Sequence, residues 1–579
     1  MFDFWQALPV TVIRRSSRAR SPSVQAALAT FSAASTQNER GAVFTRKEIV
    51  HSILDLCGYD PAVDLLDRRF LEPACGEGEF LLTAASRLLQ SCAGHHGPKS
   101  RWLRYLPACI TAVELHASSY HRARERLQQL LQTHGLNPNE ADRICRAWLK
   151  QDDFLLTELE TAFDVIAGNP PYVRQERIPA ALLTEYKRRY NTLYDRADLY
   201  IPFFERSLDA LGPDGKLGFI CANRWMKNKY GGPLRGKIAA NFTLDCYIDL
   251  QRVDAFHEQV DAYPAITIIR RAPAGQTTVI TELPAKPKTV RRARRRTPIA
   301  VRVDGVCSGR DPWLLDAPRV LHTIRALEHS LPTLEQAGAK VGIGVATGAD
   351  RIFIGPYTDL PVEADCKLPL AMTRDLGRVS LRWQGNGVVN PWMPDGTARD
   401  LENFPQLATY LARHRPTLKE RHTAKKSPRF WYKTIDRIYP ALATTPKLLI
   451  PDIRGDATIV LDQGHLYPHH NLYFVTSDVW DLRALQAILR SSVALMFVAA
   501  YSVQMAGGFL RFQAQYLRRI RLPAWSELSR EQRSALKQAA VFTDLKTIDE
   551  VVYPVYGLAG EAAQRVSTFA ARSRVAPHR

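Results

Sequence analysis

The chain has 579 residues, of which 78 are Lys or Arg and 58 are Asp or Glu, so its formal charge is +20 with neutral His. Hydrophobic residues make up 46% of the chain, which excludes a wholly disordered protein. The length predicts two or three domains. The charge suggests a polyanionic partner, most simply nucleic acid, although generic solubility would account for it equally well.

The nine cysteines are scattered and form no CxxC pair. This pattern argues against a disulfide framework and a zinc site, so we expect no metal and a reducing, cytoplasmic environment. No apolar run reaches the length of a membrane span, and we expect no membrane partner. Residues 1–40 are rich in Ser, Ala and Arg, lack the apolar core of a secretory signal, and are predicted to be a flexible basic arm.

Residues 48–58 have apolar side chains at helical spacing and end at Gly58, which predicts a helix capped by that glycine. Short apolar runs then alternate with helical stretches, and they predict a parallel or mixed sheet with helices on both faces, an α/β fold. The predicted strands are 69–72, 108–115, a run from 163 that stops at a double proline, 216–225 and 265–271, and the predicted helices are 79–90 and 118–133. Ligands of such sheets bind at the carboxyl ends of the strands.

The composition changes near residue 272. Residues 272–300 combine repeated Pro and Ala with the run KTVRRARRR (288–296), which predicts an exposed basic linker, although a merely solvated charge run would look the same. Farther along, short β-rich pieces carry interleaved aromatic and basic residues, and a helical stretch closes the chain. We therefore expect an arm at 1–40, an α/β domain at 41–275, a basic connector at 276–335, a mixed α+β domain at 336–525 and a helical segment at 526–579.

The segment FLEPACGEGEFLL (70–82) reads as a strand, a tight glycine turn and the start of a helix. It matches neither the dinucleotide-binding GxGxxG pattern nor the phosphate-binding GxxxxGK[ST] pattern. Gly76 lets the backbone approach a ligand closely, and Glu72 beside the turn favours a cationic ligand over a phosphate. Many strand-to-helix turns look similar, so this segment alone does not identify the ligand.

Two further acidic positions complete a pocket. Glu114 ends the next strand, where a carboxylate typically accepts hydrogen bonds from a ribose diol, although an ordinary exposed glutamate is as frequent there. Asp153 and Phe154 follow one helix later; an Asp can accept from an adenine amino group, and a Phe can stack on the ring. Together these residues predict a site for an adenosine with a positively charged amino-acid tail, which describes S-adenosylmethionine.

Asn169, Pro170, Pro171 and Tyr172 directly follow an apolar strand. Because prolines cannot donate to a strand ladder, the strand must end there and leave carbonyls as free acceptors. Two acceptors beside an aromatic ring match an exocyclic amine on a planar base. Hydrogen bonds to both amine protons localise the nitrogen lone pair toward a sulfonium methyl, which transfers by in-line displacement. A strand-ending turn is the alternative, but the pattern is uncommon by chance and favours catalysis.

In this order, the motifs resemble those of the gamma-class DNA amino-methyltransferases, the N6-adenine type of bacterial restriction–modification systems and their solitary relatives. The resemblance covers nearly everything after residue 40. It implies a class I (Rossmann-like) S-adenosylmethionine-dependent methyltransferase sheet, followed by a C-terminal target-recognition domain. The matching segments include GAVFTRKEIV (41–50), FLEPACGEGEFLL (70–82), AVEL (112–115), DDFLL (152–156), NPPY (169–172), 253–271, 342–354, RFWYK (429–433) and GGFLRFQ (507–513).

The resemblance also implies roles for single residues. Catalysis would rest on Asn169, Pro170, Pro171 and Tyr172, and the base would stack on Tyr172 and on Phe256 or Tyr263. Cofactor contacts would come from Thr45, Glu72, Ala74, Gly76, Glu114, Asp153, Phe154 and Asn169. The family usually has Thr-Pro where this chain has Thr45-Arg46, a departure that would weaken or alter the cofactor lid. Asp152 competes with Asp153 for the adenine, and the family's Asp-Phe pattern favours Asp153.

An enzyme that acts on a base must take it out of the stack, which needs a pocket and a second domain that grips the duplex. Lys and Arg side chains would then contact the phosphates. The residues expected to do so are Arg291, Arg292, Arg294, Arg295, Arg296, Arg511 and Arg518. The resemblance implies double-stranded DNA as a partner, a possible separate cognate restriction endonuclease, and a prokaryotic, nucleoid-associated protein.

Several alternatives share this chemistry. N4-cytosine methyltransferases act on the same kind of amine but more often carry Ser in place of Asn169. RNA or protein-glutamine methyltransferases with an NPPY motif do not need a large basic β-rich appendage. A DNA-binding subunit without catalysis does not fit the intact motifs. About 40 residues precede the first motif, too few for a fused nuclease domain, so we expect methylation without cleavage.

Overall fold

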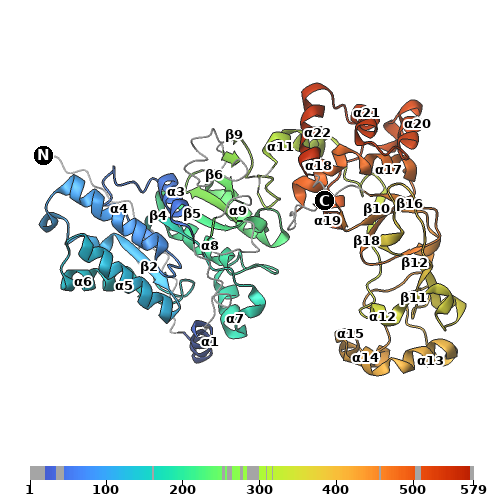
Figure 1. Ribbon diagram of the computed structural model, residues 1–579, viewed down its shortest axis with the longest axis horizontal. Helices are drawn as coiled ribbons and strands as arrows, with labels where there is room; N and C mark the ends of the chain where they lie inside the picture. Colours follow the sequence, from blue (N-terminus) through green and yellow to red (C-terminus); the bar gives the residue numbers. More distant parts are fainter. Residues whose placement is uncertain are drawn as a thin grey trace. The chain divides into compact units, whose positions relative to one another are not determined.

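The computed structural model describes residues 20–33, 45–159, 162–250, 255–256, 264–273, 278–282, 299–307, 309–315, 317–454, 458–502 and 510–573. The chain divides into two compact units, Met1–Trp313 and Leu314–Arg579. Figure 1 shows both units with the labels of their helices and strands. Each unit has its own hydrophobic core clusters.

In the described residues, the first unit is built on a nine-stranded sheet with the order β3-β2-β1-β4-β5-β7-β6-β8-β9. The strands are β1 Phe70–Glu72, β2 Ile110–Glu114, β3 Leu149–Gln151, β4 Phe163–Gly168, β5 Leu211–Ala222, β6 Thr243–Asp249, β7 Pro264–Arg270, β8 Thr278–Glu282 and β9 Ile299–Val303. Strands β3, β2, β1, β4 and β5 run parallel to one another, and β7 runs antiparallel between β5 and β6. The carboxyl ends of the parallel strands therefore lie at one edge of the sheet.

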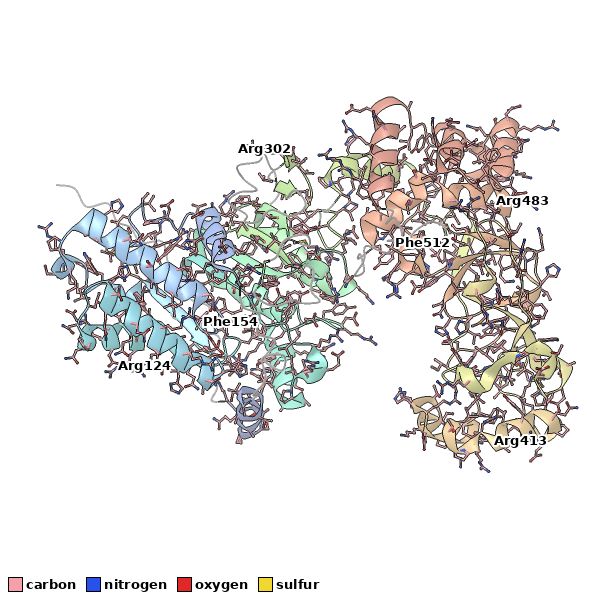
Figure 2. All side chains as sticks on the ribbon, in the orientation of Figure 1. Arg124, Phe154, Arg302, Arg413, Arg483 and Phe512 are labelled. Carbon is pink, nitrogen blue, oxygen red and sulfur yellow. The ribbon has the colours of Figure 1, made fainter. Side chains whose placement is uncertain are left out.

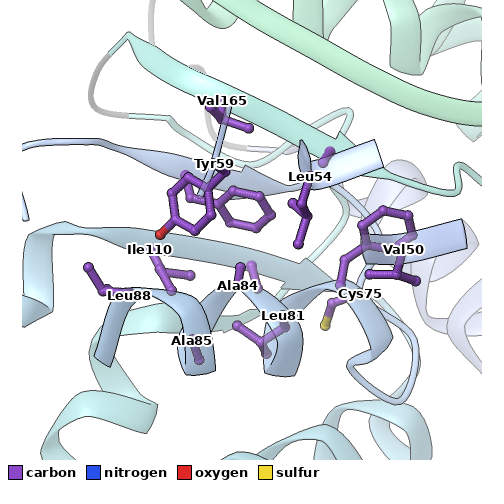
Figure 3. Packing of buried hydrophobic residues seen from close by; sticks show 14 of the residues in the cluster. Val50, Leu54, Tyr59, Cys75, Leu81, Ala84, Ala85, Leu88, Ile110 and Val165 are labelled. Carbon is purple, nitrogen blue, oxygen red and sulfur yellow. The ribbon is translucent and has the colours of Figure 1, made fainter. Parts of the chain in front are cut away.

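Helices connect and cover these strands, as the alternation in the sequence predicts. They are α1 Pro22–Ser32, α3 Lys47–Cys57, α4 Glu79–His96, α5 Ala117–Thr133, α6 Pro138–Trp148, α7 Ala180–Arg189, α8 Tyr200–Ala210 and α9 Gly232–Asn241. The predicted cap of α3 is confirmed: Gly58 has φ of 75°, in the left-handed region that favours glycine. Figure 3 shows side chains of α3 and α4 packed with Ile110 of β2 and Val165 of β4.

A close approach fixes α3 on the sheet. Gly218 of β5 lies under the helix, and a Cβ atom added there would be 2.5 Å from the Cys57 sulfur and 2.8 Å from a methyl carbon of Ile53. Both neighbours are buried, so neither can move away cheaply. Glycine at this position therefore lets α3 sit against β5, and α3 follows directly on Thr45 and Arg46.

The predicted domain boundary at 275 is wrong. Strand β8 pairs in parallel with β6, and β9 pairs antiparallel with β8, so the sheet extends into the segment expected to be a connector. The rest of the predicted connector includes α11 Pro318–Ser330, which belongs to the second unit. These strands were missed because they are short and flanked by Pro- and Arg-rich sequence, which masks their β pattern.

The second unit mixes strands and helices. Among the described residues, one sheet has the order β10-β18-β14-β16, another has the order β11-β13-β12-β17, and β15 pairs with β19. The strands are β10 Ala339–Ile343, β11 Ile354–Pro356, β12 Lys367–Ala371, β13 Asn386–Val389, β14 Lys447–Pro451, β15 Ile453–Arg454, β16 Val460–Asp462, β17 Tyr467–Pro468, β18 Leu472–Ser477 and β19 Leu510–Arg511. A mixed α and β architecture after residue 336 agrees with the prediction.

The second unit also contains helices between and after its strands. Besides α11, they are α12 Asp350–Phe353, α13 Pro405–Arg413, α14 Arg415–Glu420, α15 His422–Lys426, α16 Ala441–Thr444, α17 Leu482–Arg490, α18 Ser492–Tyr501, α19 Ala514–Leu517, α20 Arg530–Ala539, α21 Leu545–Val555 and α22 Gly560–Ser573. Every residue of α18 is buried, and it packs against α17, α21 and α22. No single helix in the described ranges is long and apolar enough to cross a membrane; α17 and α18 pass that test only as a pair bent by 60°.

Candidate functional site

A pocket opens where the parallel strands of the first unit end. Glu72 is the last residue of β1 and Glu114 the last of β2, while Asp153 follows β3 and Asn169 follows β4, and all four side chains line the pocket. These strands are neighbours in the sheet. The topology thus brings together residues that lie up to 97 positions apart in the sequence.

All eight residues predicted to contact a cofactor line this one pocket: Thr45, Glu72, Ala74, Gly76, Glu114, Asp153, Phe154 and Asn169. Pro171 also lines it, whereas Pro170 and Tyr172 do not belong to its lining. The lining further contains residues that sequence reasoning missed, among them Phe31, His116 and Tyr186. Phe31 and Tyr186 lie on helices without a recognisable motif, so no local signal marked them.

Glu114 holds the glycine turn in place. Its Oε2 atom accepts a hydrogen bond of 2.8 Å from the Gly76 N–H, and its Oε1 atom accepts one of 2.8 Å from the His116 N–H. Gly76 and Gly78 have φ of 52° and 96°, values that L side chains rarely adopt. The carboxylate at the end of β2 therefore fixes the backbone of the turn that follows β1.

Glu72 is a buried carboxylate inside the pocket, with 2% of its surface exposed. Among the described residues, its Oε2 atom has no hydrogen-bond partner. Burial raises the pKa of Glu72 well above its usual range, and the nearby carboxylates of Glu79 and Glu114 raise it further. A buried acceptor without a partner beside other acidic groups suits a ligand that carries positive charge.

We expect the affinity for S-adenosylmethionine to fall as the pH drops through the raised pKa of Glu72. A cationic ligand binds the ionised carboxylate better, so the ligand is bound tightly above that pKa and weakly below it, and binding near it releases a proton. Isothermal titration calorimetry in two buffers with different protonation enthalpies measures this release. Glu72→Gln should abolish it, while Glu125→Gln, an exposed change on α5, should leave it intact; equal release from the Glu72→Gln variant would contradict the assignment.

The two aspartates after β3 have different partners. Asp152 accepts hydrogen bonds of 2.7 and 2.8 Å from one guanidinium nitrogen of Arg20, which forms an ion pair. Asp153 is buried, accepts a bond of 2.7 Å from the Leu155 N–H and accepts another from the Tyr186 hydroxyl. Burial raises the pKa of Asp153, and its hydrogen bonds partly oppose the rise. Asp152 is thus paired with a cation, whereas the partners of Asp153 are a backbone N–H and a hydroxyl.

An aromatic wall stands beside Asp153. Phe154, labelled in Figure 2, is buried and its ring centroid lies 5.0 Å from that of Phe203 on α8. Both rings line the pocket. The guanidinium of Arg206 lies over the Phe154 ring at 5.2 Å. A flat aromatic surface next to a hydrogen-bond acceptor is the arrangement that recognises a purine.

Asn169 connects two of the predicted motifs. Its Nδ2 atom donates a hydrogen bond of 3.2 Å to the Oγ1 atom of Thr45, 124 residues earlier in the chain. This contact sets the orientation of the amide group at the carboxyl end of β4. The Tyr172 ring, three residues on, lies 6.2 Å from the buried Tyr200 ring, centroid to centroid.

The structure does not bring the Phe256 ring to this pocket. Thr45 and Phe256 form an antiparallel bridge, and Phe256 is only 5% exposed within the core cluster that contains α3. Burial of the ring with apolar neighbours accounts for this position. Tyr263, the competing candidate for the second stacking aromatic, lies outside the described residues.

Arg46 joins the start of α3 to the segment of Phe256. Its backbone N–H donates to the Ala255 carbonyl at 3.1 Å, and its Nε atom donates to the Phe256 carbonyl at 3.0 Å. A proline at this position would have neither donor. The departure from Thr-Pro was expected to weaken or alter the lid, and that stays a prediction; the structure shows that Arg46 makes two hydrogen bonds that a proline could not make.

We expect Arg46→Ala to lower the free energy of unfolding by about 1–3 kcal/mol, because the partly buried Phe256 carbonyl loses the hydrogen bond that the charged guanidinium donates to it. Arg46→Pro should lower it more, since the Ala255 bond is lost as well; φ of −64° at this position means that proline itself fits the backbone. Urea unfolding measures both changes. Lys47→Ala, an exposed change one residue on, is the control. Equal stability of the Ala and Pro variants would show that the backbone bond contributes nothing.

Two of the arginines predicted to contact DNA, Arg511 and Arg518, lie in the described part of the chain, and each has an acidic partner there. Arg511 forms an ion pair with Asp452, and Arg518 forms one of 2.7 Å with Glu335 and also donates to the Val341 carbonyl at 2.9 Å. A phosphate would have to compete with these partners. Arg291, Arg292, Arg294, Arg295 and Arg296 lie outside the described residues.

Two other features of the second unit have structural roles. Trp431 and Tyr432 of the RFWYK segment are buried in a hydrophobic core cluster, so they do not offer a stacking face. Within the described residues, Asp350, His469 and His470 are the group whose donor atoms come close enough for a metal ion. His469 and Asp350 are already joined by a hydrogen bond of 3.2 Å, which ties α12 to the turn before β18.

Comparison with known proteins relates most of the chain to one group. The family described as "Eco57I restriction-modification methylase" matches residues 81–256. The type II methyltransferase M.XhoI of Xanthomonas vasicola is 50% identical over 535 residues, which cover 90% of this chain and 98% of that protein. The type II methyltransferase M.PaeR7I of Pseudomonas aeruginosa is 49% identical over 538 residues, 90% of this chain and 92% of that protein.

A solved structure extends the comparison to the fold. The structure of MmeI, a type IIL restriction–modification enzyme in complex with DNA, superposes with a TM-score of 0.57 and 14% sequence identity. The match covers 91% of this chain and 75% of the MmeI chain. It therefore includes both the unit that carries the pocket and much of the unit that follows it.

Proposed function

Because the chain belongs to the type II methyltransferases of restriction–modification systems, we propose that it methylates the N6 amine of an adenine flipped out of duplex DNA, with S-adenosylmethionine as the methyl donor. The observation that carries the proposal is the single pocket at the ends of four neighbouring strands. It combines Glu72, Glu114 and Asp153 with the amide of Asn169.

The pocket fits this cofactor part by part. Glu72 would face the cationic end, because its buried Oε2 atom has no partner among the described residues. Glu114 would accept from the ribose diol, and Asp153 with Phe154 would bind the adenine ring. When bound, S-adenosylmethionine supplies a methyl group on a positively charged sulfur, an electrophile that needs no further activation.

The protein's own task is to prepare the amine. Asn169 and the backbone carbonyl freed by Pro170 and Pro171 would accept the two amine protons, which turns the nitrogen lone pair out of the base plane. Thr45 holds the Asn169 amide in the required orientation through the bond of 3.2 Å. Tyr172 would stack on the base and keep its plane fixed. Since attack precedes proton loss, no strong base is needed at this step.

The second unit is proposed to recognise the target sequence in DNA. Support comes from the positive charge of the chain, +20. It also comes from two type II methyltransferases that this chain matches over 98% and 92% of their length. The fold match to MmeI, whose structure contains DNA, extends across most of this chain. We place the protein in the bacterial cytoplasm with a separate cognate endonuclease, since M.XhoI and M.PaeR7I, which match 90% of this chain, are named as methyltransferases alone.

The test is to incubate the purified protein with duplex DNA and methyl-labelled S-adenosylmethionine and to identify the labelled nucleoside by mass spectrometry. N6-methyl-2′-deoxyadenosine in the digested DNA supports the proposal. N4-methylcytosine would keep the methyltransferase assignment and overturn the choice of base. Label only in RNA, or only on a glutamine of a protein substrate, would overturn DNA as the substrate. Methylome sequencing of a host that expresses the protein would then give the recognition site.

A further inference from the structure

Helix α1 lies within the stretch predicted to be a flexible basic arm, and the structure shows an ordered contact instead. The helix begins where Ser21 caps it, with its side chain accepting from the Val24 N–H, and Pro22 occupies the first turn. It packs against α7, and Figure 1 shows it beside that helix at the lower edge of the first unit. Val24 is buried there, which gives the helix an apolar anchor.

The beginning of α1 is tied to the end of β3. Arg20 directly precedes the helix cap, and one of its guanidinium nitrogens contacts both carboxylate oxygens of Asp152, at 2.7 and 2.8 Å. Both side chains are 26% exposed, so water screens the pair only in part. Asp152 lines the pocket and also accepts from the Asp153 N–H at 2.8 Å. The ion pair is therefore one residue away from the proposed acceptor of the adenine amine.

The end of α1 is tied to the end of β2. The Ser32 carbonyl lies 3.0 Å from the Nδ1 atom of His116, and the His116 N–H in turn donates to Glu114. Phe31, in the last turn, lines the pocket together with both residues after β2. A helix of 11 residues is about 16 Å long, enough to reach from one neighbouring strand end to the next across a ligand.

From these contacts we propose that α1 is a cap over the adenosine half of the cofactor pocket, with Phe31 as a direct cofactor contact and Arg20 as the positioning residue that holds the cap closed. This inference rests on the proposed function and adds a cofactor-binding element to it. The two anchors, Asp152 and His116, lie next to the groups assigned to adenine and ribose. The methionine end is assigned to Glu72 and Thr45, which form no part of either anchor.

The cap changes how the ligand exchanges. Phe31 removes apolar surface of the ligand from water, and the ligand cannot leave until the Arg20–Asp152 pair opens. Loss of either side chain should therefore act mainly on the dissociation rate. A helix that only stabilised the fold would instead alter unfolding without a specific effect on the ligand.

The experiment compares three single variants of the full chain, Phe31→Ala, Arg20→Ala and the control Gln25→Ala, which changes an exposed residue of α1. Stopped-flow fluorescence and calorimetry measure binding of S-adenosylhomocysteine and of 5′-methylthioadenosine, which lacks the amino-acid tail. We expect Phe31→Ala and Arg20→Ala to weaken both ligands about tenfold, chiefly through faster dissociation, while Gln25→Ala leaves them unchanged. Thermal unfolding without ligand checks that the variants are folded.

Hydrogen exchange adds a readout that is independent of affinity. Amides of residues 22–32 should become more protected when S-adenosylhomocysteine binds to the wild-type protein, and this gain should be lost in Arg20→Ala. Wild-type affinity in both variants, or a penalty for S-adenosylhomocysteine but none for 5′-methylthioadenosine, would overturn the cap. If the wild-type protein itself binds neither ligand, the proposed cofactor fails, which is a different result from failure of the cap.

Discussion

Replacement of Asn169 by Ala is expected to lower the rate of methyl transfer by about a hundredfold to a thousandfold, with cofactor affinity changed little. The amide oxygen would accept a proton of the target amine in the transition state, and loss of one such fixed group typically costs about 10² to 10³ in rate. Glu72, Glu114 and Asp153 would still bind the cofactor. Single-turnover methylation of duplex DNA measures the rate, and calorimetry with S-adenosylhomocysteine measures the affinity.

Two further variants sharpen this result. Thr45→Val removes the acceptor that orients the Asn169 amide, so it should slow transfer by about tenfold, in the range of one neutral hydrogen bond. Asn241→Ala changes an exposed asparagine at the end of α9 and should have no effect. Normal turnover by Asn169→Ala would remove Asn169 from the catalytic assignment, and equal loss of cofactor binding would show that it acts on the cofactor instead.

Glu114→Ala is expected to weaken S-adenosylhomocysteine binding by about a hundredfold. The change removes the proposed acceptor of the ribose diol, and hydrogen bonds to a charged group contribute about 1.5–3 kcal/mol each. It also releases the Gly76 and His116 N–H groups that the carboxylate now holds at 2.8 Å. The glycine turn would then have to be ordered by the ligand at a further cost in free energy. Equilibrium dialysis or calorimetry measures the change.

Glu125→Ala, an exposed change on the neighbouring helix α5, serves as the matched control and should bind like the wild type. Glu114→Gln separates the two roles of the carboxylate. It keeps one acceptor for the turn but not both, so its affinity should lie between those of the wild type and Glu114→Ala. Wild-type affinity in the Ala variant would rule out Glu114 as a cofactor ligand.

The part of the pocket that could be predicted is the part built from local signals. Glu72, Glu114 and Asn169 each stand at the end of an apolar run that predicts a strand. A glycine turn follows Glu72 within a few residues, and a double proline follows Asn169 directly. Parallel pairing then brings these strand ends together whatever lies between them. Thr45 was found through its resemblance to a motif, and its contact with Asn169 across 124 residues supports the placement.

The features that were missed depend on contacts distant in sequence. Arg20 reaches Asp152 across 132 residues, and nothing near Arg20 marks it as different from other arginines of the first segment. Phe256 was expected at the base, but the Thr45 bridge and the apolar core account for its burial. Arg511 was expected to contact phosphate, and nothing in the sequence indicated its ion pair with Asp452, 59 residues away. Charge and aromaticity alone do not indicate which partner a side chain will find.

The bond between Glu114 and Gly76 has a consequence for turnover. The turn is already shaped by the protein, so under the proposed function it would favour any ligand that carries adenosine, and the spent cofactor carries the same adenosine as the fresh one. The two would differ only at the sulfur, because loss of the methyl group converts a cationic sulfonium into a neutral thioether. A site made this rigid at the shared end should be strongly inhibited by its own product. The rate at which a cell degrades S-adenosylhomocysteine would then limit the rate of methylation.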